Sequence, residues 1–277
     1  MAKGIGLIGN FRGKVGNMVG YNLKDSNNKQ TQGVRVYQPI VKNPKTYAQA
    51  EQRAKLAPIN ATYRALKAII DRGQEGKTYG NKSRLAWLSS AMKEFYGGWF
   101  GKGETIAYPA LVTITKGSLP FKPVFNDDEN VLTLKISGID DSDSTIGAVS
   151  KKLIAAYSGL QNGDQLTFVS IYDVNGNLSA KFDSFILNTE SADTLPSWLT
   201  IPRPENLVAW SGDSNCVAIA IIASREAANG QHLRSTASLT TTDNYDNSLL
   251  EDAAKDAAIK SYMAGSTSSD WAEESIQ

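Results

Sequence analysis

Glycines near the start of the chain have a spacing typical of nucleotide-binding turns. GIGLIG at residues 4–9 matches G-x-G-x-x-G, and GKV at residues 13–15 echoes the end of a phosphate-binding loop. A dinucleotide turn needs a strand before it and a helix after it. Only three residues precede Gly4, and no helical pattern follows. The phosphate loop is one residue short and has Val15 where the Mg²⁺-binding hydroxyl should be. We therefore predict no nucleotide site in this run, and interpret its glycines as allowing turns in an extended segment.

Histidine and cysteine are nearly absent, which restricts catalytic and metal chemistry. The chain has one cysteine, Cys216, and one histidine, His232. Multi-cysteine and two-histidine zinc sites are therefore excluded, and a Ser-His-Asp triad could use only His232. The acidic run at 126–130 lacks the spacing of a calcium loop and is interpreted as a turn. The run at 140–144 lies where a helix N-terminus favours acids and is interpreted as a cap. We predict no enzyme activity, no cofactor and no bound metal.

The net charge of +1 conceals a strong asymmetry along the chain. Residues 1–102 carry 18 basic and 5 acidic side chains, whereas the remainder carries 11 basic and 23 acidic ones. Such a division indicates two different electrostatic roles, or two halves that attract neighbouring copies of the chain.

Aromatic residues are interspersed among the basic residues of the N-terminal segment. Lysine and arginine neutralise phosphates and aromatic rings stack on unpaired bases, so nucleic acid is one possible partner. An acidic neighbouring subunit is the other. The candidate nucleic-acid-binding or partner-binding residues are Lys3, Arg12, Lys14, Tyr21, Lys24, Lys29, Arg35, Tyr37, Lys42, Lys45 and Arg53.

Composition and periodicity together predict an α+β chain in four parts. The first is a basic, glycine-rich arm at 1–45, in which Val15–Tyr21 and Val34–Ile40 flank a polar turn with Asn27–Asn28 near its tip. A helical segment at 46–102, an antiparallel β-sandwich-like domain at 108–245, and an acidic C-terminal helix and tail at 246–277 follow.

The helical segment has clear start and stop signals. Thr46-x-x-Gln49 is a capping box, Pro58 should kink or divide the first helix, and Arg72–Gly73 should end it. A second helix is expected from Ser83 to Tyr96. Its predicted apolar stripe consists of Leu85, Leu88, Met92 and Phe95.

Short apolar or alternating runs from residue 108 onward predict about seven strands, and Asn175–Gly176 predicts a tight hairpin. A helix is expected from Ile146 to Ser158, with Gly159 as its stop signal. Ser248-x-x-Glu251 is expected to cap the final helix, which Gly265 ends.

Two motifs carry a resemblance to a known family. GNFRGKVGNMVGY at 9–21 and VKNPKTYAQAEQRAK at 41–55 resemble an uncharacterised family, a domain of unknown function, encoded by Bacteroidetes and their phages. The resemblance covers about the first 55 residues and implies an assembly or interaction role on a β-rich fold. The second motif is also similar to openings of phage virion proteins.

These patterns predict a non-enzymatic structural protein, a phage virion component that is assembled in the bacterial cytoplasm. No signal peptide and no membrane span are expected. The expected partners are other copies of the chain or other virion proteins, with DNA as a further possibility. Two alternatives stay open. One is a cytoplasmic, sequence-nonspecific nucleic-acid-binding protein, and the other is a surface carbohydrate-binding β-domain that would use exposed Trp198, Trp210 or Trp271.

Overall fold

The chain divides into two compact units, Met1–Lys45 and Thr46–Gln277, and each is described by itself. The structure is a computed structural model. It describes residues 13–24, 30–37, 46–128, 131–140, 142–203, 206–208, 215–227 and 232–264. Helices and antiparallel sheets both occur, so the predicted α+β class is confirmed.

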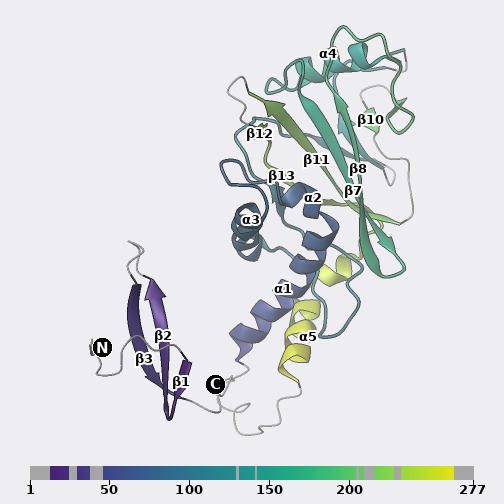
Figure 1. Cartoon of the computed structure of the whole chain (residues 1–277). Helices are drawn as coiled ribbons and strands as arrows, with labels where there is room; N and C mark the ends of the chain where they lie inside the picture. The colour runs from purple at the N-terminus through teal and green to yellow at the C-terminus, as the bar shows by residue number, and fades with distance from the viewer. Residues whose placement is uncertain are drawn as a thin grey trace. The chain divides into compact units, whose positions relative to one another are not determined.

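The N-terminal unit contains an antiparallel sheet of order β1-β2-β3 (Figure 1). Its strands are β1 Gly13–Val15, β2 Met18–Lys24 and β3 Gln30–Val36. Gly16 has a φ of 55° in the turn between β1 and β2, a conformation that glycine adopts without steric cost. The strands extend into the polar run predicted as a turn, because Lys24 pairs with Gln30. The predicted tip, Asn27–Asn28, lies outside the described residues.

Three helices open the larger unit: α1 Tyr47–Ala65, α2 Lys67–Ile70 and α3 Asn81–Glu94. Half of the predicted capping box is present, since Thr46 Oγ1 accepts a hydrogen bond from the Gln49 N–H at 3.4 Å. The reciprocal bond is absent, because Gln49 Oε1 is buried and forms no hydrogen bond to a described residue. Of the two effects predicted for Pro58, division of the first helix is wrong, and a kink stays a prediction. Helix α1 continues through Pro58, which is buried, and the Pro58 carbonyl accepts a hydrogen bond from Thr62 Oγ1.

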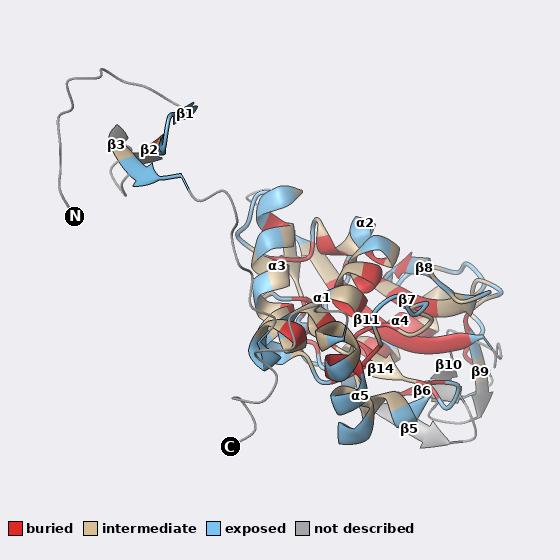
Figure 2. Ribbon diagram, turned by 90° about the horizontal axis from the view of Figure 1, so that it is seen from below, coloured by how far each residue is buried: buried red, intermediate tan, exposed pale blue. Residues whose placement is uncertain are grey.

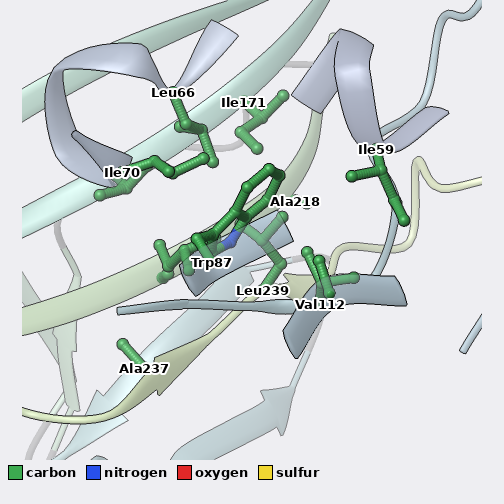
Figure 3. Packing of buried hydrophobic residues seen from close by; sticks show 14 of the residues in the cluster. Ile59, Leu66, Ile70, Trp87, Val112, Ile171, Ala218, Ala237 and Leu239 are labelled. Carbon is green, nitrogen blue, oxygen red and sulfur yellow. The ribbon is translucent and has the colours of Figure 1, made fainter. Parts of the chain in front are cut away.

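The apolar stripe predicted for α3 is partly wrong. Leu88, Met92 and Phe95 are partly buried against the core, but Leu85 is 63% exposed. The fully buried positions are Ser83, Trp87 and Ala91, which are spaced four residues apart along α3. Trp87 decides this orientation because its large ring fills the core and its indole N–H donates to the Thr113 carbonyl at 2.9 Å. Figure 3 shows the Trp87 ring between Leu66, Ile171, Ala218 and Leu239.

The central sheet of the larger unit has the order β12-β11-β7-β8, with β14 also pairing with β11. Its strands are β7 Gln165–Val174, β8 Asn177–Ile186, β11 Cys216–Glu226, β12 His232–Arg234 and β14 Thr240–Thr241. The predicted hairpin is confirmed. Asn175 and Gly176 have φ values of 53° and 80°, and Val174 pairs with Asn177.

The central sheet is covered on both faces (Figures 1 and 2). Val169 and Ile171 of β7 pack with the residues of α1, α2 and α3. Leu166 and Phe168, at the alternate positions, pack against α4 Ile146–Ala156 and against strand β6 Val131–Lys135. Helices therefore cover one face, and α4 with part of a smaller sheet covers the other.

The smaller sheet has the order β5-β6-β10-β9, and a two-stranded sheet pairs β13 with β4. Their strands are β4 Thr113–Thr115, β5 Phe125–Asp128, β6 Val131–Lys135, β9 Thr200–Arg203, β10 Asn206–Val208 and β13 Ala237–Ser238. Sequence analysis did not predict β5 and β9, which are short.

The C-terminal helix begins later than the sequence predicts. Asp246 caps the short 3₁₀ helix η1 Asn247–Leu250 by accepting a hydrogen bond from the Ser248 N–H. Helix α5, Asp252–Met263, follows Glu251 without a side-chain cap, so the predicted Ser248–Glu251 capping box is wrong. Helix α5 packs on α1 through small and apolar residues, namely Ala50, Ala54, Ala258 and Ile259, together with Trp99. Gly265, the predicted stop, and the tail lie outside the described residues.

Candidate functional site

One face of the N-terminal sheet carries basic and aromatic side chains. Lys14 pairs with Val19 and Val19 with Arg35, so these three residues share one face. Tyr37 continues the same alternation after β3, and Lys14 Nζ lies 3.6 Å from the centre of its ring. This distance is well within the range of a cation–π contact. The face therefore combines positive charge with an exposed ring.

Tyr21 lies on that same face, opposite Gly33. A Cβ atom at position 33 would be 2.6 Å from the Tyr21 ring, so the ring lies across the glycine. This arrangement explains why glycine occupies the middle of β3, where it otherwise weakens a strand. A side chain at position 33 would have to displace Tyr21 from the face.

One end of the opposite face of the N-terminal sheet carries exposed apolar side chains, whereas polar residues hold the same register positions toward Lys24 and Gln30. Met18 pairs with Val36, and Gly20 pairs with Val34. Met18, Val34 and Val36 are 41%, 52% and 75% exposed. A three-stranded sheet with its apolar side chains in water is marginal by itself, so this face indicates a contact with another surface.

The structure unites only some of the residues predicted as a binding site. Lys14, Tyr21, Arg35 and Tyr37 share the face described above. Lys24 ends β2 in the alternate register, and Arg53 lies on α1 in the larger unit. The other predicted site residues, Lys3, Arg12, Lys29, Lys42 and Lys45, lie outside the described residues. Their part in binding stays a prediction.

The larger unit has a cleft of about 590 Å³ that the sequence did not reveal. Three separate segments line it: the loop 74–79 before α3, residues 116–118 after β4, and strand β12 at 232–234. Backbone hydrogen bonds fix the first two walls to each other. The Glu75 N–H donates to the Lys116 carbonyl and the Lys116 N–H donates to the Gly73 carbonyl, each at 3.0 Å.

Glu75 fastens the three walls together. Its carboxylate accepts hydrogen bonds from the Ser118 N–H at 2.8 Å, the Ser118 hydroxyl at 2.7 Å and the Arg234 N–H at 3.3 Å. Partial burial raises the pKa of Glu75, but these hydrogen bonds and the Arg234 charge outweigh it and hold the pKa below its ordinary value. Both carboxylate oxygens are therefore occupied in holding the cleft in shape.

Tyr79 stands in the cleft among positive groups. The guanidinium carbons of Arg72 and Arg234 each lie 5.9 Å from the centre of its ring, and the His232 ring centre lies 6.4 Å away. Tyr79 is 51% exposed. Lys77 and Lys116 also line the cleft, and Lys116 forms an exposed ion pair with Glu94 at 3.4 Å.

The single histidine and the single cysteine of the chain lie in different surroundings. The imidazole of His232 is exposed and forms no hydrogen bond to a described residue, and Cys216 is buried in β11. Among the described residues, no group of three His, Cys, Asp or Glu side chains could hold a metal ion. Asp143, in the acidic run 140–144, instead pairs with Lys152 at 2.6 Å.

Trp198, one of the three tryptophans proposed to bind carbohydrate, packs against other aromatic side chains. Trp198 is half-buried, with its ring centre 5.6 Å from that of Phe168 and 6.2 Å from that of Phe185. The side chains of Trp210 and Trp271 lie outside the described residues. The described residues therefore offer no specific support for a carbohydrate-binding role.

Comparison of the chain with protein-family models, with curated proteins and with solved structures finds no match. Within the part of the chain that the structure describes, no helix has the length and apolar character needed to cross a membrane. The function must therefore be argued from the geometry of the chain's own surfaces.

Proposed function

We propose that this chain is a non-enzymatic structural protein of a larger assembly, a phage virion component, and that its N-terminal unit binds a neighbouring copy. One observation carries the proposal. The sheet of that unit exposes basic and aromatic side chains on one face and Met18, Val34 and Val36 on the other. Such a small sheet gains a core only when a partner covers its apolar face.

Charge supports a second copy as the partner. Residues 1–102 are strongly basic and the remainder of the chain is strongly acidic. The apolar face would pack on the neighbour, while the Lys14 and Arg35 face would be attracted to acidic surface. The N-terminal arm would become fully ordered on binding, so each contact would have modest affinity and the assembly would depend on many copies. The virion setting rests on the similarity of residues 43–53 to openings of phage virion proteins, which stays an expectation from the sequence.

Charge reversal in the arm provides the test. The variant carrying Arg12→Glu, Lys14→Glu and Arg35→Glu should be monomeric, whereas the unaltered chain should form ordered oligomers without DNA. Molar mass in solution at low and high salt measures this. The matched control is Lys67→Glu, Lys93→Glu and Lys151→Glu, because these exposed residues of the larger unit give the same change in net charge. Assembly retained by the arm variant, or lost equally in the control, would overturn the proposal.

Nucleic acid is the second candidate partner, and the Lys14–Tyr37 contact favours it because a cation beside an exposed ring suits a phosphate and an unpaired base. This candidate predicts a monomer that binds nonspecific DNA, with affinity that falls steeply as salt rises. The same mass measurement with and without DNA distinguishes the two partners.

A further inference from the structure

We propose that the cleft around Tyr79 binds a nucleotide, with the base on the exposed Tyr79 ring and the phosphate among Arg72, Lys77 and Arg234. This site lies in the larger unit and does not depend on the assembly proposed for the N-terminal unit. It is also unrelated to the glycine run at residues 4–9.

The charges of the cleft favour an anion. The basic side chains Arg72, Lys77, Lys116 and Arg234 surround or line it. Lys116 is paired with Glu94, but Arg72, Lys77 and Arg234 form no ion pair with any described residue. The guanidinium carbons of Arg72 and Arg234 each lie 5.9 Å from the centre of the Tyr79 ring, and Lys77 lines the cleft. A phosphate bound there would receive charge-assisted hydrogen bonds from these groups.

Glu75 brings one negative charge into the cleft, and the basic side chains that surround or line the cleft outnumber it. Its two oxygens accept three hydrogen bonds from Ser118 and Arg234, so they are directed into the wall rather than left for a cation. The wall is also tightly built. A Cβ atom at Gly117 would meet the Arg234 carbonyl oxygen and lie 2.7 Å from Glu75 Oε2. The cleft is therefore formed before any ligand arrives, which lowers the entropic cost of binding.

The exposed Tyr79 ring indicates that the ligand is a nucleotide rather than a simple anion. A phosphate alone would need only the cations, whereas Tyr79, whose ring centre is 5.9 Å from each guanidinium carbon, is 51% exposed. An aromatic ring beside arginines is the combination by which proteins hold a base and its phosphate together. A volume of about 590 Å³ falls within the range of small-ligand sites.

The single histidine of the chain provides a direct test. Because His232 is the one histidine and lines the cleft, its imidazole proton signals in an NMR spectrum of the full chain need no further assignment. Adenosine monophosphate should shift these signals in a saturable manner. Pyrophosphate should do so more weakly, and adenosine least. No shift at saturating nucleotide, or a pyrophosphate affinity equal to that of the nucleotide, would overturn the proposal.

Variants test separately the contacts to the phosphate and the contacts to the base. Arg72→Gln with Arg234→Gln should weaken nucleotide and pyrophosphate binding by about tenfold or more, equivalent to about 1.4 kcal/mol. Tyr79→Leu should weaken nucleotide binding by about fivefold or more and leave pyrophosphate binding unchanged. Lys93→Gln and Tyr96→Leu, at exposed positions in or just after α3, are the matched controls and should change neither. Loss of binding in the controls, or unchanged nucleotide binding in the Tyr79 variant, would contradict it.

The source of the nucleotide is settled by a second titration. A short single-stranded oligonucleotide that shifts the His232 signals, and does so less in the Tyr79→Leu variant, would show that the cleft takes one unit of a strand. If the mononucleotide alone shifts them, the ligand is a free nucleotide. Either result supports the site, and the arm variant with Arg12, Lys14 and Arg35 reversed should bind the mononucleotide as the unaltered chain does.

Discussion

The N-terminal sheet and the central sheet of the larger unit are both antiparallel, yet their side chains meet opposite surroundings. In β11 every residue from Cys216 to Ala223 is buried, whereas in β3 the side chains of Val34, Arg35 and Val36 are all exposed. Figure 2 shows this contrast between the buried β11 and the exposed β3. Backbone pairing is the same in both, so what differs is the number of layers that cover the sheet.

In the central sheet, successive side chains point to opposite faces, but the sequence shows no alternation of polar and apolar residues because both faces are apolar. Ala218, Ala220 and Ile222 of β11 face the helices α1 to α3, while Ile221 and Ala223 face α4. In the N-terminal sheet the alternation separates charge from apolar surface. The first sheet is a structural core, whereas the second leaves apolar side chains exposed, as our proposal of a covering neighbour requires.

The largest loss of stability should follow from removing a large buried side chain between the helices and the central sheet. Trp87→Ala removes a ring that is 1% exposed and its hydrogen bond to the Thr113 carbonyl, so it should lower the free energy of unfolding by about 3–5 kcal/mol. Leu85→Ala, two residues away but 63% exposed, should cost less than about 0.5 kcal/mol. Urea unfolding of the two variants measures this. A larger loss of unfolding free energy for Leu85→Ala than for Trp87→Ala would mean that α3 buries the stripe containing Leu85.

A smaller, pH-dependent effect should come from Tyr245, which packs on the same core. Its hydroxyl donates to the Pro109 carbonyl at 3.0 Å, and burial, aided by Asp246 and Tyr108, raises its pKa far above the ordinary 10.0. The folded chain therefore keeps Tyr245 neutral where the unfolded chain ionises. Its contribution to stability is complete below about pH 10 and is lost as the pH rises above that value.

Tyr245→Phe should therefore cost about 1 kcal/mol at neutral pH and reduce the loss of stability between about pH 9 and about pH 11. Urea midpoints across that range provide the measurement, with Tyr96→Phe as the control at a ring that is 71% exposed. Other partly buried tyrosines, such as Tyr157 and Tyr108, retain part of the dependence because burial raises their pKa values too. An unchanged alkaline slope in the Tyr245 variant would contradict the assignment.

The smallest effect on stability is expected on the N-terminal sheet. Val34→Ser with Val36→Ser alters side chains that are 52% and 75% exposed, so the unfolding free energy of the larger unit should stay within about 0.5 kcal/mol. The proposed association should weaken nonetheless, because the apolar face is the surface that a neighbour would cover. Sedimentation of the variant beside the unaltered chain measures the association, and urea unfolding measures the stability. If the variant associates as strongly as the unaltered chain, Val34 and Val36 do not form the contact with a neighbour.

Local signals in the sequence predicted elements well where the residues nearby decide the structure. Thr46 caps a helix because its hydroxyl reaches a backbone N–H three residues on. Asn175–Gly176 makes the β7–β8 turn because both residues accept a positive φ. The run at 165–174 has the bounds of β7 itself. In each case the deciding interaction is short-range, so it is visible in a few consecutive letters.

Predictions were wrong where packing outweighed a local preference. Pro58 does not divide α1, since its neighbours in the helix are buried in the core. Trp87 rather than Leu85 faces inward because the large ring gains more from burial. The Ser248 capping signal is superseded by Asp246, which begins a 3₁₀ turn before α5. The cleft around Tyr79 was missed for a related reason, since its walls come from three segments far apart in the sequence.

The sequence by itself determined the α+β class, the charge asymmetry, and the scarcity of histidine and cysteine that disfavours metal and triad chemistry. Tertiary structure alone decided which face of α3 is buried, that the central sheet is covered on both sides, and that Tyr79, His232 and Arg234 meet in one cleft. Composition and hydrogen bonds between near neighbours are properties of short segments. Burial and the meeting of charges depend on contacts between residues more than a hundred positions apart, which no local pattern specifies.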